Sequence, residues 1–244
     1  MSSQRKRKYR RGYPVAILIG LGDTQAVLWN VFSQVVKPQK TLHLIGARNN
    51  PRAMYNFHES ILNAIRPTLN EGIRSIIVAS PPRSKYAQSF IDHIHQHHLW
   101  LVQGSNKAIF SETTGRAGTR AEVTTLIRTP TFYQLINKTT SEETKGLLDI
   151  LDQYLHALNQ GKSALFSLKE IEELLLSPRK QGRPKPDYLL LTNKYLSMSN
   201  NKNRLHRLIQ IAKNKNAKTR IVGAESPAGL RLTQLGGLVC LCTT

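Results

Sequence analysis

The segment that most constrains the fold is the closing one, residues 213–244. A short run of β-forming residues, 219–222, is followed by a polar turn with a glycine and a proline. Residues 228–235 can form two turns of helix, and a glycine pair directly after them would end that helix. An apolar strand at 238–241 closes the chain. A strand, a short helix and a final buried strand predict an α/β unit.

The residues before this segment continue the same architecture. Segment 141–159 has apolar residues at helical spacing, and the basic, proline-containing loop 177–186 lies between a helix and a buried strand. The elements expected here are helices at 121–128, 130–138, 141–159, 168–176 and 205–213 and a strand at 188–191.

The first half of the chain predicts three antiparallel strands and then alternating helices and strands. A turn at 22–24 separates two β-rich runs, which indicates a hairpin, and Met54, Phe57 and Ile61 stand at helical spacing. The expected strands are 14–21, 26–36, 41–45, 75–79 and 99–103, and the expected helices are 52–65 and 85–97.

These patterns predict the fold class α/β, with two consecutive α/β sandwich domains. We expect a basic arm at residues 1–12, a first domain at 13–118 and a second at 119–244. A chain of 244 residues is long enough for two domains of ordinary size.

The charge of the chain indicates a polyanionic partner. Lys and Arg number 35 against 15 Asp and Glu, which gives a net charge of +20. Nucleic acid is the most frequent partner of such a chain, and an anionic membrane is the competing interpretation. No apolar run reaches the ~18 residues that a membrane-spanning helix needs, so we expect no membrane insertion.

Cys240 and Cys242 point to the same face of the last expected strand, and they lack a second Cys or His pair at zinc-like spacing. We interpret them as core thiols in a reducing cytosol. The basic cluster before the first apolar run resembles the start of a signal peptide, but no small-residue cleavage site follows it. We therefore expect a cytoplasmic protein.

Four segments carry a family resemblance. RSIIVASP at 74–81 is a strand that leads into an Ala-Ser-Pro turn, and TTGRAGTRAEVTTLIRTP at 113–130 leads into a short helix. Residues 145–173 contain two helices joined by an aromatic-x-Leu link, and the closing segment 213–244 follows. In this order and spacing they resemble the central and C-terminal domains of Pelota and the class-1 peptide-chain release factors. The resemblance implies a ribonuclease-H-like mixed sheet in the first domain and a release-factor-like second domain.

Three departures from that family shape the functional expectation. Residues 1–12 are too short for the family's N-terminal Sm-like domain, which we expect to be absent. Release factors carry a Gly-Gly-Gln loop whose Gln positions the hydrolytic water, whereas residues 46–57 read GARNNPRAMYNF. GRAGTR at 115–120 lies too late in the domain to replace that loop. The family's Ala-Ser-Pro-Gly-Phe turn contacts a translational GTPase, and here Pro82 and Arg83 stand in place of Gly and Phe.

The candidate RNA-binding residues are basic and lie in the arm or in loops. The arm alternatively serves as a solubilising tail or a nuclear address, and the loop residues alternatively belong to ordinary exposed loops or a linker. The candidates are Arg5, Lys6, Arg7, Lys8, Arg10, Arg11, Arg48, Arg52, Arg179, Lys180, Arg183 and Lys185. Pro81, Pro82 and Arg83 are the candidate partner-binding residues.

Neither a metal, a cofactor nor a catalytic group is expected. His93 and His97 could share an ion, but the sequence places no carboxylate or cysteine to complete a site with these and the neighbouring His95 and His98. Asp23 and Glu59 do not form the converging carboxylates that ribonuclease-H chemistry requires. Gly161-Lys162-Ser163 lacks the preceding glycine of a phosphate loop.

The sequence therefore predicts a non-catalytic ribosome-binding factor of the Pelota type, acting in ribosome rescue, recycling or dormancy. Its expected partners are ribosomal RNA and tRNA, with a recycling ATPase as a further candidate and the translational GTPase disfavoured. The alternatives are a peptidyl-tRNA hydrolase or ribonuclease with a non-standard loop, and a general RNA-binding adaptor.

Overall fold

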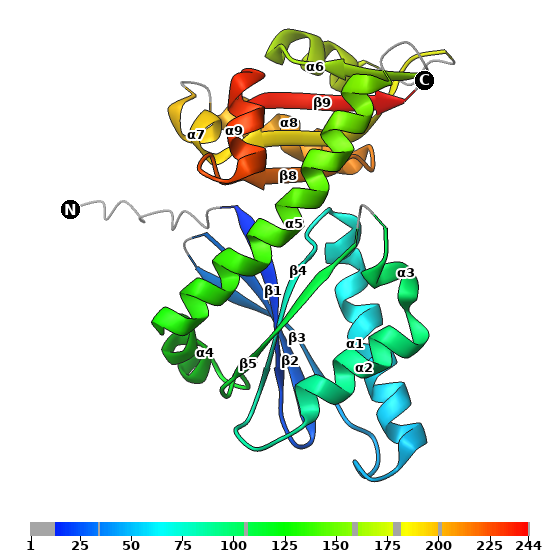
Figure 1. The fold of residues 1–244 in the computed structure, drawn as a ribbon, viewed down its shortest axis with the longest axis vertical. Helices are drawn as coiled ribbons and strands as arrows, with labels where there is room; N and C mark the ends of the chain where they lie inside the picture. Colours follow the sequence, from blue (N-terminus) through cyan, green and yellow to red (C-terminus); the bar gives the residue numbers. More distant parts are fainter. Residues whose placement is uncertain are drawn as a thin grey trace, which may run out of the picture.

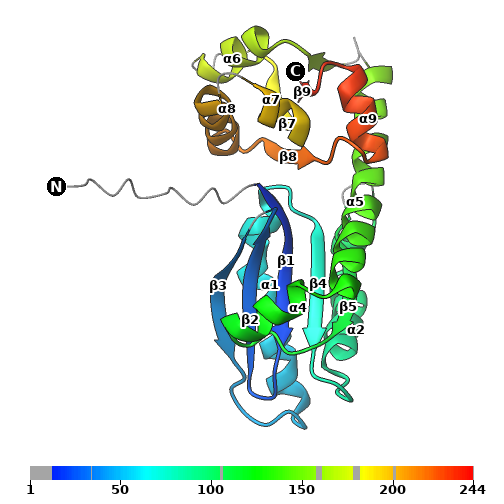
Figure 2. The same ribbon diagram turned by 90° about the vertical axis from the view of Figure 1, so that its left-hand side faces the viewer.

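The computed structural model describes residues 13–33, 35–104, 107–157, 161–177, 182–199 and 202–243. Two α/β units lie one above the other, and a single long helix, α5, runs along both of them (Figures 1 and 2). This arrangement confirms the predicted fold class of two consecutive α/β units.

The first unit contains a five-stranded mixed sheet in the order β3-β2-β1-β4-β5. β1 pairs antiparallel with β2 and parallel with β4, where Ile17 lies opposite Ile76. The three antiparallel strands that the sequence predicted are present, although the second ends before the predicted residue 36. The strands are β1 (Pro14–Leu21), β2 (Gln25–Phe32), β3 (Val36–His43), β4 (Ser75–Ser80) and β5 (Ile109–Thr114).

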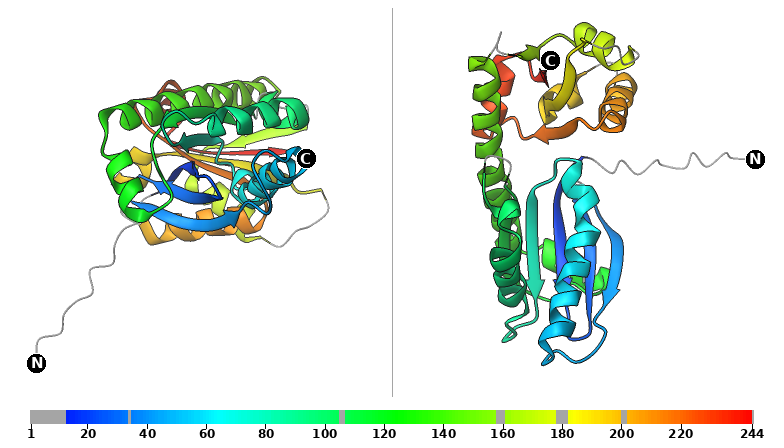
Figure 3. Two further views of the ribbon diagram at one scale, coloured as in Figure 1. Left: turned by 90° about the horizontal axis from the view of Figure 1, so that it is seen from below. Right: turned by 90° about the vertical axis from the view of Figure 1, so that its right-hand side faces the viewer.

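Helices cover both faces of this sheet (Figure 3). α1 and α2 bury Phe57, Ile61 and Phe90 against one face, and α4 and the start of α5 bury Leu126 and Phe132 against the other. α1 begins at Pro51 because the side chain of Asn50 accepts hydrogen bonds from the backbone N–H groups of the first turn, and because proline is favoured at the first helical position. The helices are α1 (Pro51–Asn70), α2 (Tyr86–His97), α3 (Leu99–Val102), α4 (Arg120–Ile127) and α5 (Pro130–His156).

The strand predicted at residues 99–103 is wrong. Residues Leu99–Val102 form the short helix α3, and the edge strand is β5, at Ile109–Thr114. The four-residue apolar run LWLV fits a strand or a buried helix turn equally well by periodicity. The edge strand itself is half-buried and polar (IFSETT), so it lacks the apolar signal of a central strand.

The break predicted between the helices 130–138 and 141–159 is also wrong, because α5 is continuous over Pro130–His156. Thr139 and Thr140 occupy the predicted break, and their hydroxyls donate to the backbone carbonyls of Leu135 and Ile136, 2.7 and 2.8 Å away. These bonds satisfy the hydroxyls within the helix. Two threonines therefore do not interrupt it.

The second unit contains a four-stranded sheet in the order β6-β9-β7-β8. β7 and β8 are parallel, and β9 runs antiparallel to both β6 and β7. The predicted closing order of strand, helix and strand is confirmed. The elements are β6 (Lys162–Leu165), α6 (Leu168–Leu176), β7 (Lys185–Thr192), α7 (Asn193–Met198), α8 (Lys202–Asn214), β8 (Lys218–Val222), α9 (Pro227–Gln234) and β9 (Leu238–Thr243).

Two apolar clusters sandwich the second sheet. α5 and α9 pack on one face of it, where Leu151 and Leu232 meet Leu190, and α6 and α8 pack on the other. Cys240 and Cys242 are both fully buried with their sulfurs 3.7 Å apart, which confirms the predicted core position.

The two units meet through a seam of polar side chains. Arg220 on β8 forms an ion pair with Glu143 of α5, at 2.5 Å between Nη2 and Oε1, and Ser75 at the start of β4 donates its hydroxyl proton to the same carboxylate. Lys213 also reaches across, and its Nζ lies 2.7 Å from Glu71 Oε2.

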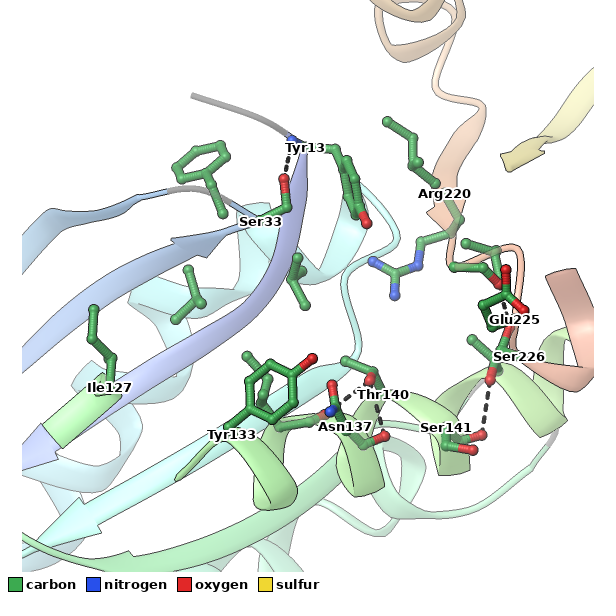
Figure 4. Close-up of a pocket in the computed structure, with 18 of the residues that line it drawn as sticks. Tyr13, Ser33, Ile127, Tyr133, Asn137, Thr140, Ser141, Arg220, Glu225 and Ser226 are labelled. Atoms are coloured by element: carbon green, nitrogen blue, oxygen red, sulfur yellow. Dashed lines mark hydrogen bonds between the residues drawn. The ribbon is translucent and has the colours of Figure 1, made fainter. Parts of the chain in front are cut away.

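A cavity of about 710 Å³ opens beside this seam (Figure 4). Tyr13, Tyr133 and Arg220 line it together with Ser226 at the start of α9. α4 and the first turns of α5 pack on the first sheet, and the later turns of α5 pack on the second sheet. Because α5 belongs to both cores, the domain boundary at 118/119 stays a prediction.

None of the helices built from described residues is long and apolar enough to cross a membrane.

Candidate nucleic-acid interface

The connections at one end of the first sheet bring most of the described candidate residues together. The parallel strands β1, β4 and β5 end there, at Leu21, Ser80 and Thr114. The β1–β2 turn and the start of α1 lie at the same end, at the bottom of Figure 1. We call this set of connections, residues 22–24, 44–52, 81–86 and 115–120, the basic end.

Arg48 is the structural centre of the basic end. Its guanidinium lies 3.7 Å from the ring centroid of Tyr86, and its Nε donates to the Asp23 carbonyl at 2.7 Å. A second N–H of the same group donates to the carbonyl of Gly22. Tyr86 in turn donates its hydroxyl proton to the Asp23 carboxylate at 2.8 Å. Arg48 thereby holds the hairpin turn, the loop before α1 and the start of α2 together.

Burial lowers the pKa of Arg48, while the neighbouring Tyr86 and Asp23 act in the opposite direction. The guanidinium remains charged at any physiological pH because its ordinary pKa lies so high. Phosphate binding by Arg48 stays a prediction, and the contacts give this residue a positioning function in addition.

Arg52 extends from the first turn of α1 and is exposed. Asn50 fixes this turn, because its Oδ1 accepts from the backbone N–H groups of Arg52 and Ala53 at 3.0 and 3.2 Å. The side chain of Arg52 is thus presented from a rigid backbone, and its RNA contact stays a prediction.

The turn after β4 has an unusual backbone. Pro81 is half-buried, Pro82 and Arg83 are exposed, and Arg83 adopts a φ of 63°. Only glycine, asparagine and aspartate commonly adopt this left-handed conformation. Ser84 stabilises the turn by donating both its N–H, at 3.2 Å, and its hydroxyl proton, at 2.7 Å, to the Pro81 carbonyl. A charged side chain is therefore held outward on a strained residue.

The loop after β5 brings two arginines that the sequence interpretation did not select. Arg116 and Arg120 are exposed, and the loop between them lies close against β1. An added side-chain carbon on Gly20 would meet the Ala117 carbonyl oxygen at 2.2 Å, and Trp29 Nε1 donates to this oxygen at 2.8 Å. The signal that could have identified these residues is the GRAGTR segment itself.

Glu122 completes this loop. Its carboxylate accepts from the backbone N–H groups of Gly118 and Thr119, both at 3.0 Å, and Thr119 caps α4 in return. This reciprocal pair is a capping box, which fixes the direction in which the helix begins. The exposed basic residues of the basic end are Arg52, Arg83, Lys85, Arg116 and Arg120.

The structure does not bring the remaining candidates to this end. Arg183 and Lys185 are exposed in the second unit, and Lys185 begins β7 opposite Thr243, next to the C-terminus. In Figure 1 this is the upper end of the molecule. The other candidates lie outside the described residues; they are Arg5, Lys6, Arg7, Lys8, Arg10, Arg11, Arg179 and Lys180.

One expectation about the histidines is wrong. The sequence interpretation found no carboxylate placed to complete a site, but Glu59 Oε1 lies 2.9 Å from His93 Nε2 and 2.6 Å from His98 Nε2. Glu59 belongs to α1 and the histidines to α2 and the residue after it. Sequence spacing could not show this neighbour, because the contact depends on how two helices pack.

The fold is similar to those of solved translation factors. The chain matches archaeal Pelota, in a model of ribosome-bound archaeal Pelota and ABCE1, with a TM-score of 0.52 and 17% identity over 93% of this chain and 61% of that one. It matches Dom34 of S. cerevisiae, described as a translation termination-like factor interacting with Hbs1, with a TM-score of 0.47 and 18% identity over 98% and 65% of the two chains.

At these identities the likeness to archaeal Pelota shows the fold, with two mixed sheets in the order of Pelota's central and C-terminal domains. The chain spans less than two thirds of the length of the structures named above. No protein-family model and no curated protein matches the sequence.

Proposed function

We propose that this chain is a non-catalytic, ribosome-binding translation factor of the Pelota type, acting in ribosome rescue, recycling or dormancy. The observation that supports it most is the basic end, which carries five exposed basic side chains and Arg48. This end belongs to a fold similar to that of archaeal Pelota. Asp23 within the basic end and Glu122 of α4 beside it are both engaged in local hydrogen bonds. The end therefore presents a positive surface suited to phosphate.

The mechanism is electrostatic positioning. The backbone of short, capped loops loses little conformational freedom on binding, and each phosphate contact that an arginine makes releases counterions from the RNA. Arg48 contributes by fixing the loops that carry Arg52 and Lys85. We propose that ribosomal RNA or the acceptor end of a tRNA meets this surface, and that Arg183 and Lys185 make a separate contact at the other end of the molecule.

The loop before α1 supports a factor that does not release peptides. In residues 46–50 Arg48 is directed at the hairpin turn and Asn50 is used in capping α1. No glutamine stands there to position a water. A peptidyl-tRNA hydrolase remains the alternative, and release of peptide from stalled ribosome–nascent chain complexes by the unmodified chain would establish it.

The turn after β4 supports weak or no binding of a translational GTPase. We propose that Pro82 and Arg83 remove the aromatic anchor that the family resemblance implies, and such anchors dominate interface energies. A pull-down of elongation-factor-like GTPases from cytosol tests this, since tight GTP-dependent capture contradicts it. A recycling ATPase stays a candidate partner, and we propose a cytoplasmic location.

The central experiment is sedimentation with purified ribosomes at a series of salt concentrations. We expect binding to weaken steeply with salt, and the triple variant Arg52→Ala, Arg83→Ala and Arg116→Ala to reduce the slope of log K against log[salt] by up to about 3. Lys169→Ala, an exposed lysine on α6, is the matched control. Unchanged binding in the triple variant, or co-sedimentation with RNA but not with ribosomal subunits, contradicts the proposal.

A further inference from the structure

A cluster of histidines lies on the α1–α2 face of the first unit, away from the basic end. Glu59 comes from the middle of α1, His93 from the last turns of α2, and His98 from the residue between α2 and α3. The three donor atoms, Glu59 Oε1, His93 Nε2 and His98 Nε2, all lie within 4.8 Å of one another. Two segments that are separate in the chain, α1 and the end of α2 with the residue after it, thus direct their ligand-type atoms at one point.

The convergence is more specific than an ordinary ion pair. Both imidazoles present the same ring nitrogen, Nε2, to a single carboxylate oxygen, at 2.9 and 2.6 Å. Two imidazole nitrogens and one carboxylate oxygen form a ligand set that zinc uses in proteins, with a fourth position left to water. Metal–ligand bonds of about 2.1 Å at tetrahedral angles place ligand atoms roughly 3.4 Å apart. Opening the two contacts by less than about 1 Å, together with bringing the two Nε2 atoms, which lie within 4.8 Å of each other, to the same spacing, accommodates the ion.

Burial around the cluster suits a bound ion that still exchanges with solvent. The side chains of His93 and His98 are 7% and 12% exposed, while that of Glu59 is 25% exposed. The histidines are therefore held by packing, and the carboxylate can move to admit an ion. Aromatic rings border the site: Tyr55 lies edge-on to His93 with 5.0 Å between ring centroids, and the Trp100 ring lies 6.4 Å from that of His98.

We propose that Glu59, His93 and His98 bind a divalent transition-metal ion, Zn²⁺ in the first place, which ties α1 to the junction of α2 and α3. Imidazole ligands favour zinc over Mg²⁺ and Ca²⁺, which prefer sets made of oxygen. Binding requires each imidazole to offer the lone pair of Nε2, so a proton on that nitrogen moves to Nδ1 of the same ring or to solvent, and three metal bonds replace the two hydrogen bonds. The ion exchanges these hydrogen bonds for a stronger cross-link between α1 and the end of α2, so it stabilises the first unit.

The test uses the full chain without an affinity tag, stripped with a chelator and titrated with Zn²⁺ by calorimetry. We expect one saturable site, a rise in melting temperature with Zn²⁺ and none with Mg²⁺, and a visible absorption band typical of four-coordinate Co²⁺ when cobalt replaces zinc. His98→Ala and Glu59→Gln should each weaken Zn²⁺ binding at least about tenfold. His95→Ala, an exposed histidine on the same helix, should leave it unchanged.

Three results would overturn the proposal. The first is the absence of saturable binding near one equivalent. The second is full binding in both His98→Ala and Glu59→Gln, which would place the ion elsewhere, for example at the Cys240 and Cys242 thiols. The third is an equal loss in His95→Ala, which would indicate non-specific binding. Circular dichroism confirms the folding of each variant, and Glu59→Gln decides if the buried histidine positions do not tolerate substitution.

Discussion

Arg220 of β8 and Glu143 of α5 form a buried ion pair that joins the two α/β units. Their side chains are only 6% and 4% exposed, and Ser75 of the first sheet donates to the same carboxylate. Arg74 is close enough to both partners to be influenced by their charges, although burial is the main reason that its pKa is lowered. One residue from α5 and two from the sheets thus fix how the units lie against each other.

Breaking this pair should destabilise the protein strongly. Arg220→Met leaves Glu143 buried without its cation, which costs about 3–5 kcal/mol in comparable sites. Urea unfolding followed by the fluorescence of Trp29 and Trp100 measures the change. The double variant Arg220→Met with Glu143→Leu should recover part of the loss, because neither charge of the pair remains, while Arg74 keeps its charge beside the site. Arg204→Ala removes an exposed ion pair and serves as the control; a single-variant cost no larger than that of this control would contradict the prediction.

Arg48 should matter for stability as well as for charge. We expect Arg48→Lys to be almost as destabilising as Arg48→Ala, by about 1–2 kcal/mol, because an ammonium cannot stack on Tyr86 and donate to two carbonyls at once. Thermal unfolding provides the measurement, with Arg52→Lys on the adjacent exposed turn as the control. Rescue of stability by lysine would show that only the charge is needed.

Alkaline pH should reveal the contact between Tyr154 and Asp187. Tyr154 donates its hydroxyl proton to Asp187 Oδ2 at 3.0 Å, and burial first, then Asp187, raises the pKa of Tyr154. The folded protein therefore keeps a proton that the unfolded chain releases near pH 10. The contribution of Tyr154 to the free energy of unfolding is therefore fully present below about pH 10 and decreases as the pH rises above that value.

Tyr154→Phe tests this directly. The variant should lose about 1 kcal/mol at neutral pH, where the hydrogen bond is missing, and its stability should fall less steeply above about pH 10 than that of the unmodified chain. Tyr133→Phe, at an exposed tyrosine, provides the comparison. Identical alkaline slopes in Tyr154→Phe and the unmodified chain would rule out the assigned cause.

The elements with regular patterns could be predicted from the sequence. The closing strand, helix and strand were found because a glycine pair ends α9 and an all-apolar strand follows it. α6 was placed at residues 168–176, its bounds in the structure. Ser167 fixes its start by accepting from the N–H of Glu170. Caps and glycine stops depend only on residues next to each other in the chain, so they can be read from the sequence.

The misplaced strand β5 and the strand β6, which the sequence analysis did not predict, lack such local signals. β5 has a polar sequence, and its backbone pairing with β4 makes it a strand. β6 is a four-residue edge strand without a fully buried residue, so it carries no apolar signal. The candidate sites follow the same division. Basic loop residues such as Arg52 were visible in the sequence, whereas the contact of Glu59 with His93 and His98, and that of Glu143 with Arg220, depend on packing between distant segments.

The backbone at Arg83 leads to a prediction that separates conformational strain from charge. A left-handed φ is unfavourable by about 1–2 kcal/mol for a residue with a side-chain carbon, and glycine adopts it freely at the cost of greater entropy in the unfolded chain. Arg83→Gly should therefore stabilise the protein by up to about 1 kcal/mol. Arg83→Ala keeps the unfavourable conformation and should not stabilise it.

Both variants should weaken ribosome binding to the same degree, because both remove the charge from the basic end. Asn216→Gly is the matched control, since Asn216 has a φ of 62° in the second unit and carries no charge; it should leave ribosome binding unchanged. Melting curves and sedimentation at several salt concentrations provide the two measurements. If Arg83→Gly stabilised the fold while ribosome binding stayed intact, Arg83 would be an exposed turn residue without a contact to RNA, and the basic end would have to act through Arg52, Arg116 and Arg120.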